Sequence, residues 1–158
     1  MISPPFLSAS EPDMAEGRIR AANHNGVYVI RFEGDVRLTL CTTIDDYFER
    51  MFEDPGFTSV WVDLCEAEGL DSTTLGLLAK LALTVKQRFG FQPAIFSCDP
   101  GINRLIKSMG FQRLFELREE LCGDENEATA IPVVEGSEAA MKEKVIEAHK
   151  VLMELSPE

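Results

Sequence analysis

Three hydroxyl side chains follow an aspartate near the middle of the chain, in the run Asp71-Ser72-Thr73-Thr74. An aspartate in this context accepts hydrogen bonds from the free N–H groups of a helix's first turn and so caps the helix. A cap needs only one such side chain. A helix N-terminus is also a place where the helix dipole favours a phosphate. The run is therefore interpreted either as simple capping or as a site for phosphate chemistry.

Motifs of common catalytic sites are missing from the sequence. It contains no phosphate-binding glycine loop, no dinucleotide fingerprint, no His-Glu-x-x-His and no Gly-x-Ser-x-Gly elbow. The two histidines, His24 and His149, are interpreted as ordinary surface residues. Asp63 and Asp71 flank one loop and could form an acid pair or hold magnesium, but no third ligand accompanies them. We predict no catalytic residues, no metal and no cofactor.

The four cysteines are widely spaced, with no Cys-x-x-Cys pair and no neighbouring histidine that would complete a zinc site. Cysteines in a reducing cytosol remain thiols and pack as small apolar side chains. Free thiols are therefore predicted at Cys41, Cys65, Cys98 and Cys122.

Composition and charge narrow the classes of partner. The 158 residues are 45% hydrophobic and 27% charged, as in an ordinary globular domain, and the formal net charge is −12. Such a charge opposes nonspecific binding to nucleic acid or to an anionic membrane. The sequence has neither a membrane-length apolar run nor the basic-then-apolar order of a secretory signal, so a cytoplasmic location is expected.

The hydroxyl run lies between a predicted strand and a predicted helix. Residues 58–64 are nearly all apolar, which is typical of an interior strand. Residues 71–89 have the apolar spacing of a long helix, and Gly90 is suited to end it. Residues 65–70 are expected to form an acidic loop that includes Glu66 and Glu68.

Strands and helices alternate along the rest of the chain. Residues 17–22 and 27–32 form a predicted antiparallel hairpin, followed by a helix at 44–52. A strand at 93–98, a helix at 102–109 and a strand at 111–117 complete the order β-β-α-β-α-β-α-β. This order favours an α/β domain with a mixed sheet covered by helices.

The ends of the chain differ from this core. Residues 1–16 are expected to be a flexible leader, 17–120 the domain, 121–136 an acidic linker and 137–158 a C-terminal amphipathic helix. Its apolar seam is predicted to pack on the chain's own domain, although it could instead join a dimer interface or dock on a partner. The seam comprises Met141, Val145, Ala148, Leu152 and Leu155.

The run Asp71-Ser72-Thr73-Thr74-Leu75-Gly76 resembles the Asp-Ser-Ser/Thr-Gly-Leu-Gly signature of STAS domains, in particular that of the bacterial anti-sigma factor antagonists. The resemblance extends over about residues 17–120 and includes 26–30, 32–34 and 109–111. It implies an α/β, STAS-like domain without catalytic activity. In that family a serine switch kinase phosphorylates the signature serine and a PP2C-type phosphatase removes the phosphate. The unphosphorylated form binds the anti-sigma factor and so frees the sigma factor.

Transferred to this sequence, the resemblance makes Ser72 the phosphoacceptor, with Thr73 as a secondary candidate. The partner-binding residues would be Asp71, Ser72, Thr73, Thr74 and Gly76, joined by the acidic Glu66 and Glu68 of the preceding loop. The negative charge of this surface predicts a basic or neutral docking face on the partner. Thr74 departs from the family pattern, which has glycine there, and its side chain could narrow the approach to the helix start.

Two other functions are compatible with the sequence. The domain could be a small-ligand or nucleotide sensor built on the same fold, although neither a glycine-rich phosphate cradle nor a basic cluster is present. It could also be a dimerising adaptor that acts through the C-terminal helix. The oligomeric state is left open.

Overall fold

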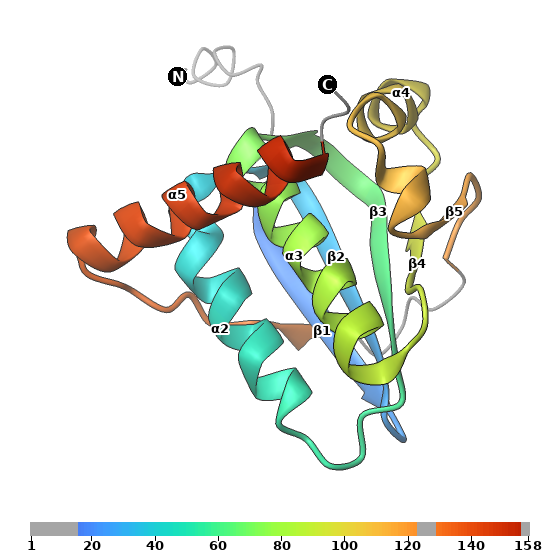
Figure 1. Ribbon diagram of the computed structural model, residues 1–158, viewed down its shortest axis with the longest axis horizontal. Coiled ribbons are helices and arrows are strands. Elements are labelled where there is room, and N and C mark those ends of the chain that lie inside the picture. Colours follow the sequence, from blue (N-terminus) through green and yellow to red (C-terminus); the bar gives the residue numbers. More distant parts are fainter. Residues whose placement is uncertain (1–15, 123–128, 156–158) are drawn as a thin grey trace, which may run out of the picture.

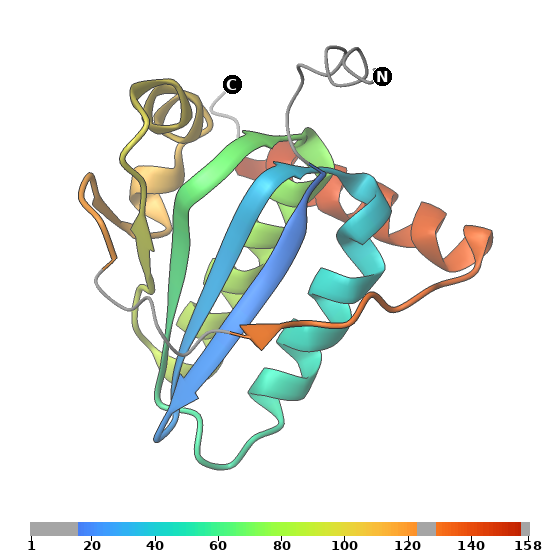
Figure 2. The ribbon, with the colours of Figure 1, turned by 180° about the vertical axis from the view of Figure 1, so that it is seen from behind.

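A mixed six-stranded sheet forms the centre of the computed structural model, which describes residues 16–122 and 129–155 (Figures 1 and 2). The strand order is β5-β4-β3-β2-β1-β6. The predicted leader lies outside the described residues, except for Glu16. The strands are β1 (Arg18–His24), β2 (Val27–Val36), β3 (Ser59–Leu70), β4 (Ala94–Phe96), β5 (Glu116–Arg118) and β6 (Thr129–Ala130).

The predicted hairpin is confirmed. β1 and β2 pair antiparallel from Arg18 opposite Glu33 to His24 opposite Val27. The connecting residues Asn25 and Gly26 both have positive φ, at 57° and 94°. This is the backbone of a two-residue hairpin turn, for which the Asn-Gly pair is the preferred sequence.

The helices that follow β2 and β3 cover one face of the sheet. α2 (Cys41–Phe52) follows a short 3₁₀ turn, η1 (Leu38–Leu40), and α3 (Ser72–Phe89) lies beside it across the sheet (Figure 1). β2, β3, β4 and β5 run parallel to one another. The main core lies between this sheet and α2 and α3, where Phe32, Ile44 and Leu78 are fully buried. The expected α/β fold with a mixed sheet and helices is confirmed.

β3 is longer than predicted. The segment expected to be an acidic loop, residues 65–70, continues the strand and pairs with β2 from Glu33 opposite Glu66 to Val36 opposite Leu70. Two register shifts let this end of the strand bend. Glu66 and Glu68 are exposed while Ala67 between them is buried, so both glutamates project from one side of a strand.

The last predicted strand is also corrected. The segment 111–117 begins as a 3₁₀ turn, η2 (Phe111–Arg113), and only its end joins β5. It follows α4 (Pro100–Ser108), which begins at the Asp99 cap. Within the expected linker, residues 129–130 form β6 and pair with β1. The acidic residues 123–128 lie outside the described part of the chain.

The C-terminal helix α5 (Glu138–Leu155) crosses the N-terminal half of α3 (Figure 1). Its predicted apolar seam faces the domain: Ala148 and Leu152 are buried, and the other seam residues pack against the same core. The prediction that the seam packs on the chain's own domain is confirmed. No helix in the described ranges is long and apolar enough to cross a bilayer.

Candidate functional site

Ser72 is the first residue of α3, directly after the helix cap. Asp71 has extended backbone angles, and its carboxylate accepts hydrogen bonds from the backbone N–H groups of Thr74 (2.9 Å) and Leu38 (2.7 Å). The first bond satisfies one of the free N–H groups at the helix start. The second ties the helix start to η1, the turn that follows β2. Asp71 therefore fixes the position of Ser72.

Only Ser72 among the three hydroxyl residues is exposed. Thr73 and Thr74 are 2% and 1% exposed, and the Thr74 hydroxyl donates to the carbonyl oxygen of Val36. The Thr74 side chain therefore points into the fold, so it does not narrow the approach to the helix start as the sequence suggested. Thr73 is too buried for a kinase to reach without local opening. This placement favours Ser72 as the phosphoacceptor.

His149, on α5, contacts the Ser72 hydroxyl. The distance from Ser72 Oγ to His149 Nε2 is 2.7 Å, and His149 Nδ1 lies 2.7 Å from the carbonyl oxygen of Val145. A carbonyl only accepts, so Nδ1 carries a proton. In a neutral imidazole Nε2 then accepts, and the Ser72 hydroxyl donates to it. The expectation that His149 is an ordinary surface residue is wrong, because it joins the C-terminal helix to the signature serine.

Gly76 is the point where α5 and α3 cross. A Cβ atom built on Gly76 would lie 2.6 Å from the Ala148 Cβ and closer still to the Ala148 carbonyl oxygen. Only glycine permits so close an approach of the two helices. The sequence assigns Gly76 to partner binding; in the structure α5 packs over this residue through Ala148.

A buried carboxylate anchors α5 to the rest of the domain. The Asp45 side chain on α2 is 2% exposed and accepts from Lys144 Nζ of α5 (2.6 Å) and from Lys80 Nζ of α3 (3.1 Å). Lys80 also bonds Glu147 of α5 at 3.0 Å. Burial raises the pKa of Asp45, but the hydrogen bond from Lys144 and the charge of Lys80 outweigh it and leave this pKa below its usual value.

We expect Asp45→Asn to lower the free energy of unfolding by roughly 1.5–3 kcal/mol at pH 7, the value of a hydrogen bond to a charged group. Because the folded-state pKa is lowered, the stabilisation by Asp45 is present above the unfolded-state pKa of about 3.9 and is lost as pH falls through the folded-state pKa. Urea unfolding of both proteins between pH 7 and pH 2 measures this. The difference in free energy of unfolding between wild type and Asp45→Asn should hold down to about pH 5 and shrink below pH 4. If this difference grew in acid, it would contradict the lowered pKa of Asp45.

Exposed acids and exposed apolar side chains occur on the elements that lead to Ser72 and on α5. Glu66 and Glu68 are exposed on β3, and Leu38, whose N–H bonds Asp71, is 39% exposed. On α5, Ile146 and Met153 are 47% and 72% exposed, three residues before and four after His149. Residues at these spacings share one side of a helix. Ile146 and Met153 therefore offer exposed apolar area on the side of α5 that carries His149.

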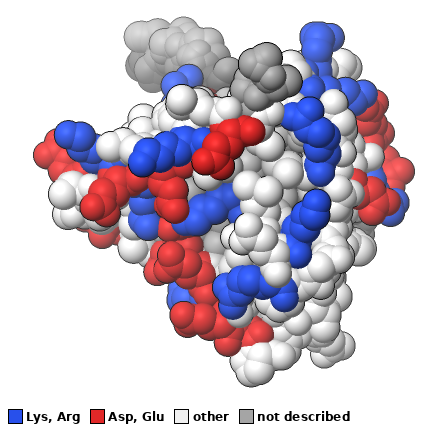
Figure 3. All heavy atoms as spheres, in the orientation of Figure 1, with Lys and Arg blue, Asp and Glu red and all other residues white. Residues whose placement is uncertain are grey.

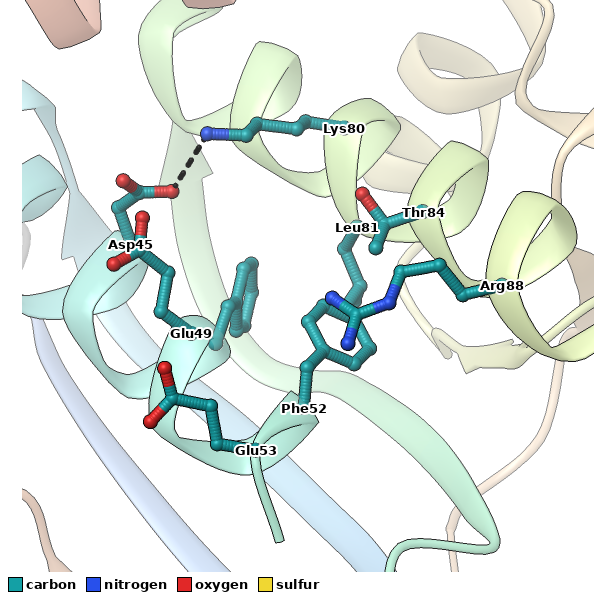
Figure 4. Close-up of a pocket in the computed structure, with 9 residues that line it drawn as sticks. Asp45, Glu49, Phe52, Glu53, Lys80, Leu81, Thr84 and Arg88 are labelled. Carbon is teal, nitrogen blue, oxygen red and sulfur yellow. Dashed lines mark hydrogen bonds and ion pairs between the residues drawn. The ribbon is translucent and has the colours of Figure 1, made fainter.

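A groove of about 310 Å³ lies between α2 and α3 (Figure 4). Its walls carry Asp45, Glu49 and Glu53 on one side and Lys80 and Arg88 on the other. Figure 3 shows acidic side chains gathered over α2 on this face, and both signs of charge along α5. Three carboxylates against two cations do not favour the phosphates of a nucleotide. The groove therefore lends no support to a nucleotide sensor.

The suggested pair of Asp63 and Asp71 does not form. Asp63 is buried beside Arg31, whose Nε lies 3.0 Å from it, and also accepts from the backbone of Cys65. Asp71 is occupied as the helix cap. Across residues 16–122 and 129–155, no group of three or more His, Cys, Asp or Glu side chains is arranged to hold a metal ion.

We expect Asp71→Ala to lower the free energy of unfolding by about 1–2 kcal/mol, because it removes the cap of α3. It also leaves the Leu38 N–H without this acceptor. Asp71→Asn is the matched control, because an amide oxygen still caps a helix. Its free energy of unfolding should fall by less than that of Asp71→Ala. Chemical denaturation followed by circular dichroism measures both variants, and equal losses for the two would contradict a capping role.

One family model and one solved structure are similar to this chain. The STAS domain family model matches residues 18–128. The crystal structure of an anti-sigma factor antagonist from Mycobacterium paratuberculosis has a similar fold, with a TM-score of 0.56 at 21% sequence identity. The match covers 76% of this chain and 92% of that one. No curated protein matches the sequence.

Proposed function

Because this chain belongs to the STAS domain family, we propose that it is an anti-sigma factor antagonist controlled by phosphorylation of Ser72. In its unphosphorylated form it binds an anti-sigma factor in the cytoplasm, which releases the sigma factor. A serine switch kinase adds the phosphate and a PP2C-type phosphatase removes it. The proposal assigns no catalytic activity to the chain. The observation that carries it is the exposed Ser72 hydroxyl at the start of α3, directly after the Asp71 cap.

The location of Ser72 allows a phosphate without unfolding the domain. A phosphoserine adds about −1.5 to −2 charges, and a helix N-terminus favours negative charge through its dipole and free N–H groups. The serine side chain faces solvent. Phosphorylation therefore changes what a partner meets while the fold is retained.

The surroundings of Ser72 explain why a partner would respond. Glu66, Glu68 and Asp71 already make the surface negative, so a complementary partner presents a basic or neutral face. Exposed Leu38, Ile146 and Met153 add apolar area that a partner can bury. A phosphate enclosed in such a contact without a matching donor costs several kcal/mol through desolvation of its charge. Phosphorylation of Ser72 would then prevent the partner from binding at this surface.

His149 couples α5 to the same switch. Nε2 of His149 lies within hydrogen-bond distance of the Ser72 hydroxyl and, when unprotonated, can assist removal of its proton as a kinase transfers a phosphoryl group. Phosphorylation replaces the hydroxyl proton that Nε2 accepts by a group with three acceptor oxygens, so it changes the contact between Ser72 and α5. Asp45 and Gly76 keep the helix docked.

Mass spectrometry of the protein purified from its native cells tests the phosphorylation. Cleavage by trypsin places Ser72 in the fragment 51–80, and fragmentation of that peptide locates the phosphate. We expect phosphate on Ser72, its retention in Thr73→Ala and its absence in Ser72→Ala. The phosphorylated protein should fail to capture the anti-sigma factor. A phosphate found only at another residue, or none under any growth condition, would overturn the proposal.

A further inference from the structure

Two cysteine thiols lie in contact beside neighbouring parallel strands, Cys65 within β3 and Cys98 two residues after the end of β4. The Sγ atoms of Cys65 and Cys98 are 3.0 Å apart. β3 and β4 pair from Trp61 opposite Ala94 to Asp63 opposite Phe96. This register, continued by two residues, places Cys65 opposite Cys98. The strand alignment therefore brings the two residues side by side, and their side-chain conformations bring the sulfurs into contact.

Such a position suits a disulfide bond. Neighbouring strands are about 4.8 Å apart, within the Cα separation of about 4.4–6.8 Å that a disulfide spans. The bond itself is about 2.05 Å long, so the two sulfurs need approach by only about 1 Å. Side-chain rotation supplies a movement of this size without a change in the sheet.

The two thiols differ in their access to an oxidant. Cys98 is exposed, whereas Cys65 is half-buried, close to Val29, Phe96 and Cys122 on the sheet face away from α2 and α3. Burial raises the pKa of the Cys65 thiol strongly, and its hydrogen bond with Cys98 and the charge of Asp63 act in the same direction. Cys65 therefore stays protonated, and Cys98 is the thiol that a reagent from solvent meets first.

We propose that Cys65 and Cys98 are a redox modification site, which peroxide converts to an intramolecular disulfide. The Cys98 sulfur attacks one oxygen of hydrogen peroxide and breaks the O–O bond, which yields a sulfenic acid and one water. The Cys65 sulfur then attacks the Cys98 sulfur, and the hydroxyl leaves with the Cys65 proton as a second water. Both sulfurs are oxidised by one electron each, and the peroxide takes up both electrons.

The disulfide would connect two segments at the end of the sheet that bears Ser72. Cys98 directly precedes the Asp99 cap of α4. Cys65 begins the extended part of β3 that carries Glu66 and Glu68 and leads to Asp71. The oxidised protein should therefore unfold at a higher temperature than the reduced protein, because the cross-link restricts the unfolded chain. This site goes beyond the proposed phosphorylation switch and does not require it.

Peroxide treatment followed by thiol counting and peptide mapping tests the proposal on the full chain. Each cysteine lies in a different tryptic fragment: 38–50, 51–80, 89–104 and 119–142. We expect wild type to lose two of its four titratable thiols and to yield one linked pair, 51–80 with 89–104. Dithiothreitol should restore both thiols and reverse the rise in melting temperature.

Two serine variants and a control make the result decisive. Cys98→Ser should lose no thiol under conditions that fully oxidise wild type, and Cys65→Ser should stop at a sulfenic or sulfinic acid on Cys98. Cys41→Ala, on the far side of the sheet core, should form the link as wild type does. Linked fragments that contain Cys41 or Cys122, a link between two molecules, or unchanged thiol loss in Cys98→Ser would overturn the proposal.

Discussion

Ser72→Glu is expected to bind the anti-sigma factor about 100-fold more weakly than wild type, which corresponds to about 3 kcal/mol. The carboxylate would be enclosed by the partner beside Glu66, Glu68 and Asp71, without a donor to compensate its desolvation. The helix dipole tolerates a negative charge at the first residue of α3, so the variant should fold. Isothermal titration calorimetry measures the affinity, and circular dichroism checks the fold.

Ser72→Gln is the matched control, because glutamine has the shape of glutamate without its charge. It should bind close to the affinity of wild type, and Ser72→Ala should bind constitutively even when the kinase is present. If the Glu and Gln variants bound equally well, charge would not be the switch. If both bound weakly, the shape of the side chain or the lost bond to His149 would be the cause.

Gly76→Ala is expected to detach α5 from α3. Alanine favours a helix over glycine by about 1 kcal/mol, so the substitution should by itself stabilise α3. The added Cβ would meet the backbone of Ala148, which cannot move aside as a side chain can. Overpacking of this kind costs typically 1–3 kcal/mol. Hydrogen exchange should therefore show faster exchange along residues 138–155 while β2 and β3 stay protected.

Gly101→Ala is the control for this substitution. Gly101 also lies in a helix, but a Cβ there would come no closer than 3.4 Å, to an oxygen of Asp99. This variant should leave exchange in α5 unchanged. If Gly76→Ala left α5 as protected as in wild type, the crossing would not depend on the glycine. Ala148→Gly should not rescue Gly76→Ala, because the nearest atom is a backbone oxygen.

Local signals predicted the elements that position Ser72. Asp71 and Gly90 mark the ends of α3 through cap chemistry that acts within a few residues, and both are the observed caps. The Asn25-Gly26 turn is also a local signal. The extension of β3 was missed, although Glu66-Ala67-Glu68 has the period of two that is typical of a half-buried strand. Its acidic composition was interpreted as a loop.

Contacts between distant parts of the chain were not predictable in the same way. Ser72 and His149 are 77 residues apart, and nothing in their local sequence pairs them. The spacing of Ala148 and Leu152 indicated the buried side of α5, but not which helix it would cross. The contact of Cys65 with Cys98 depends on the register of β3 and β4. Single-sequence patterns locate strands but do not align them.

The long separation between Ser72 and His149 also bears on the order of folding. Contacts between residues far apart in sequence form only after the intervening chain has closed, so they tend to come late. The parallel pairing of β2 with β3 closes a shorter stretch of chain than the contact of α5 with the start of α3, so we expect it to form first. A refolding chain would then expose Ser72 without its histidine neighbour before α5 docks.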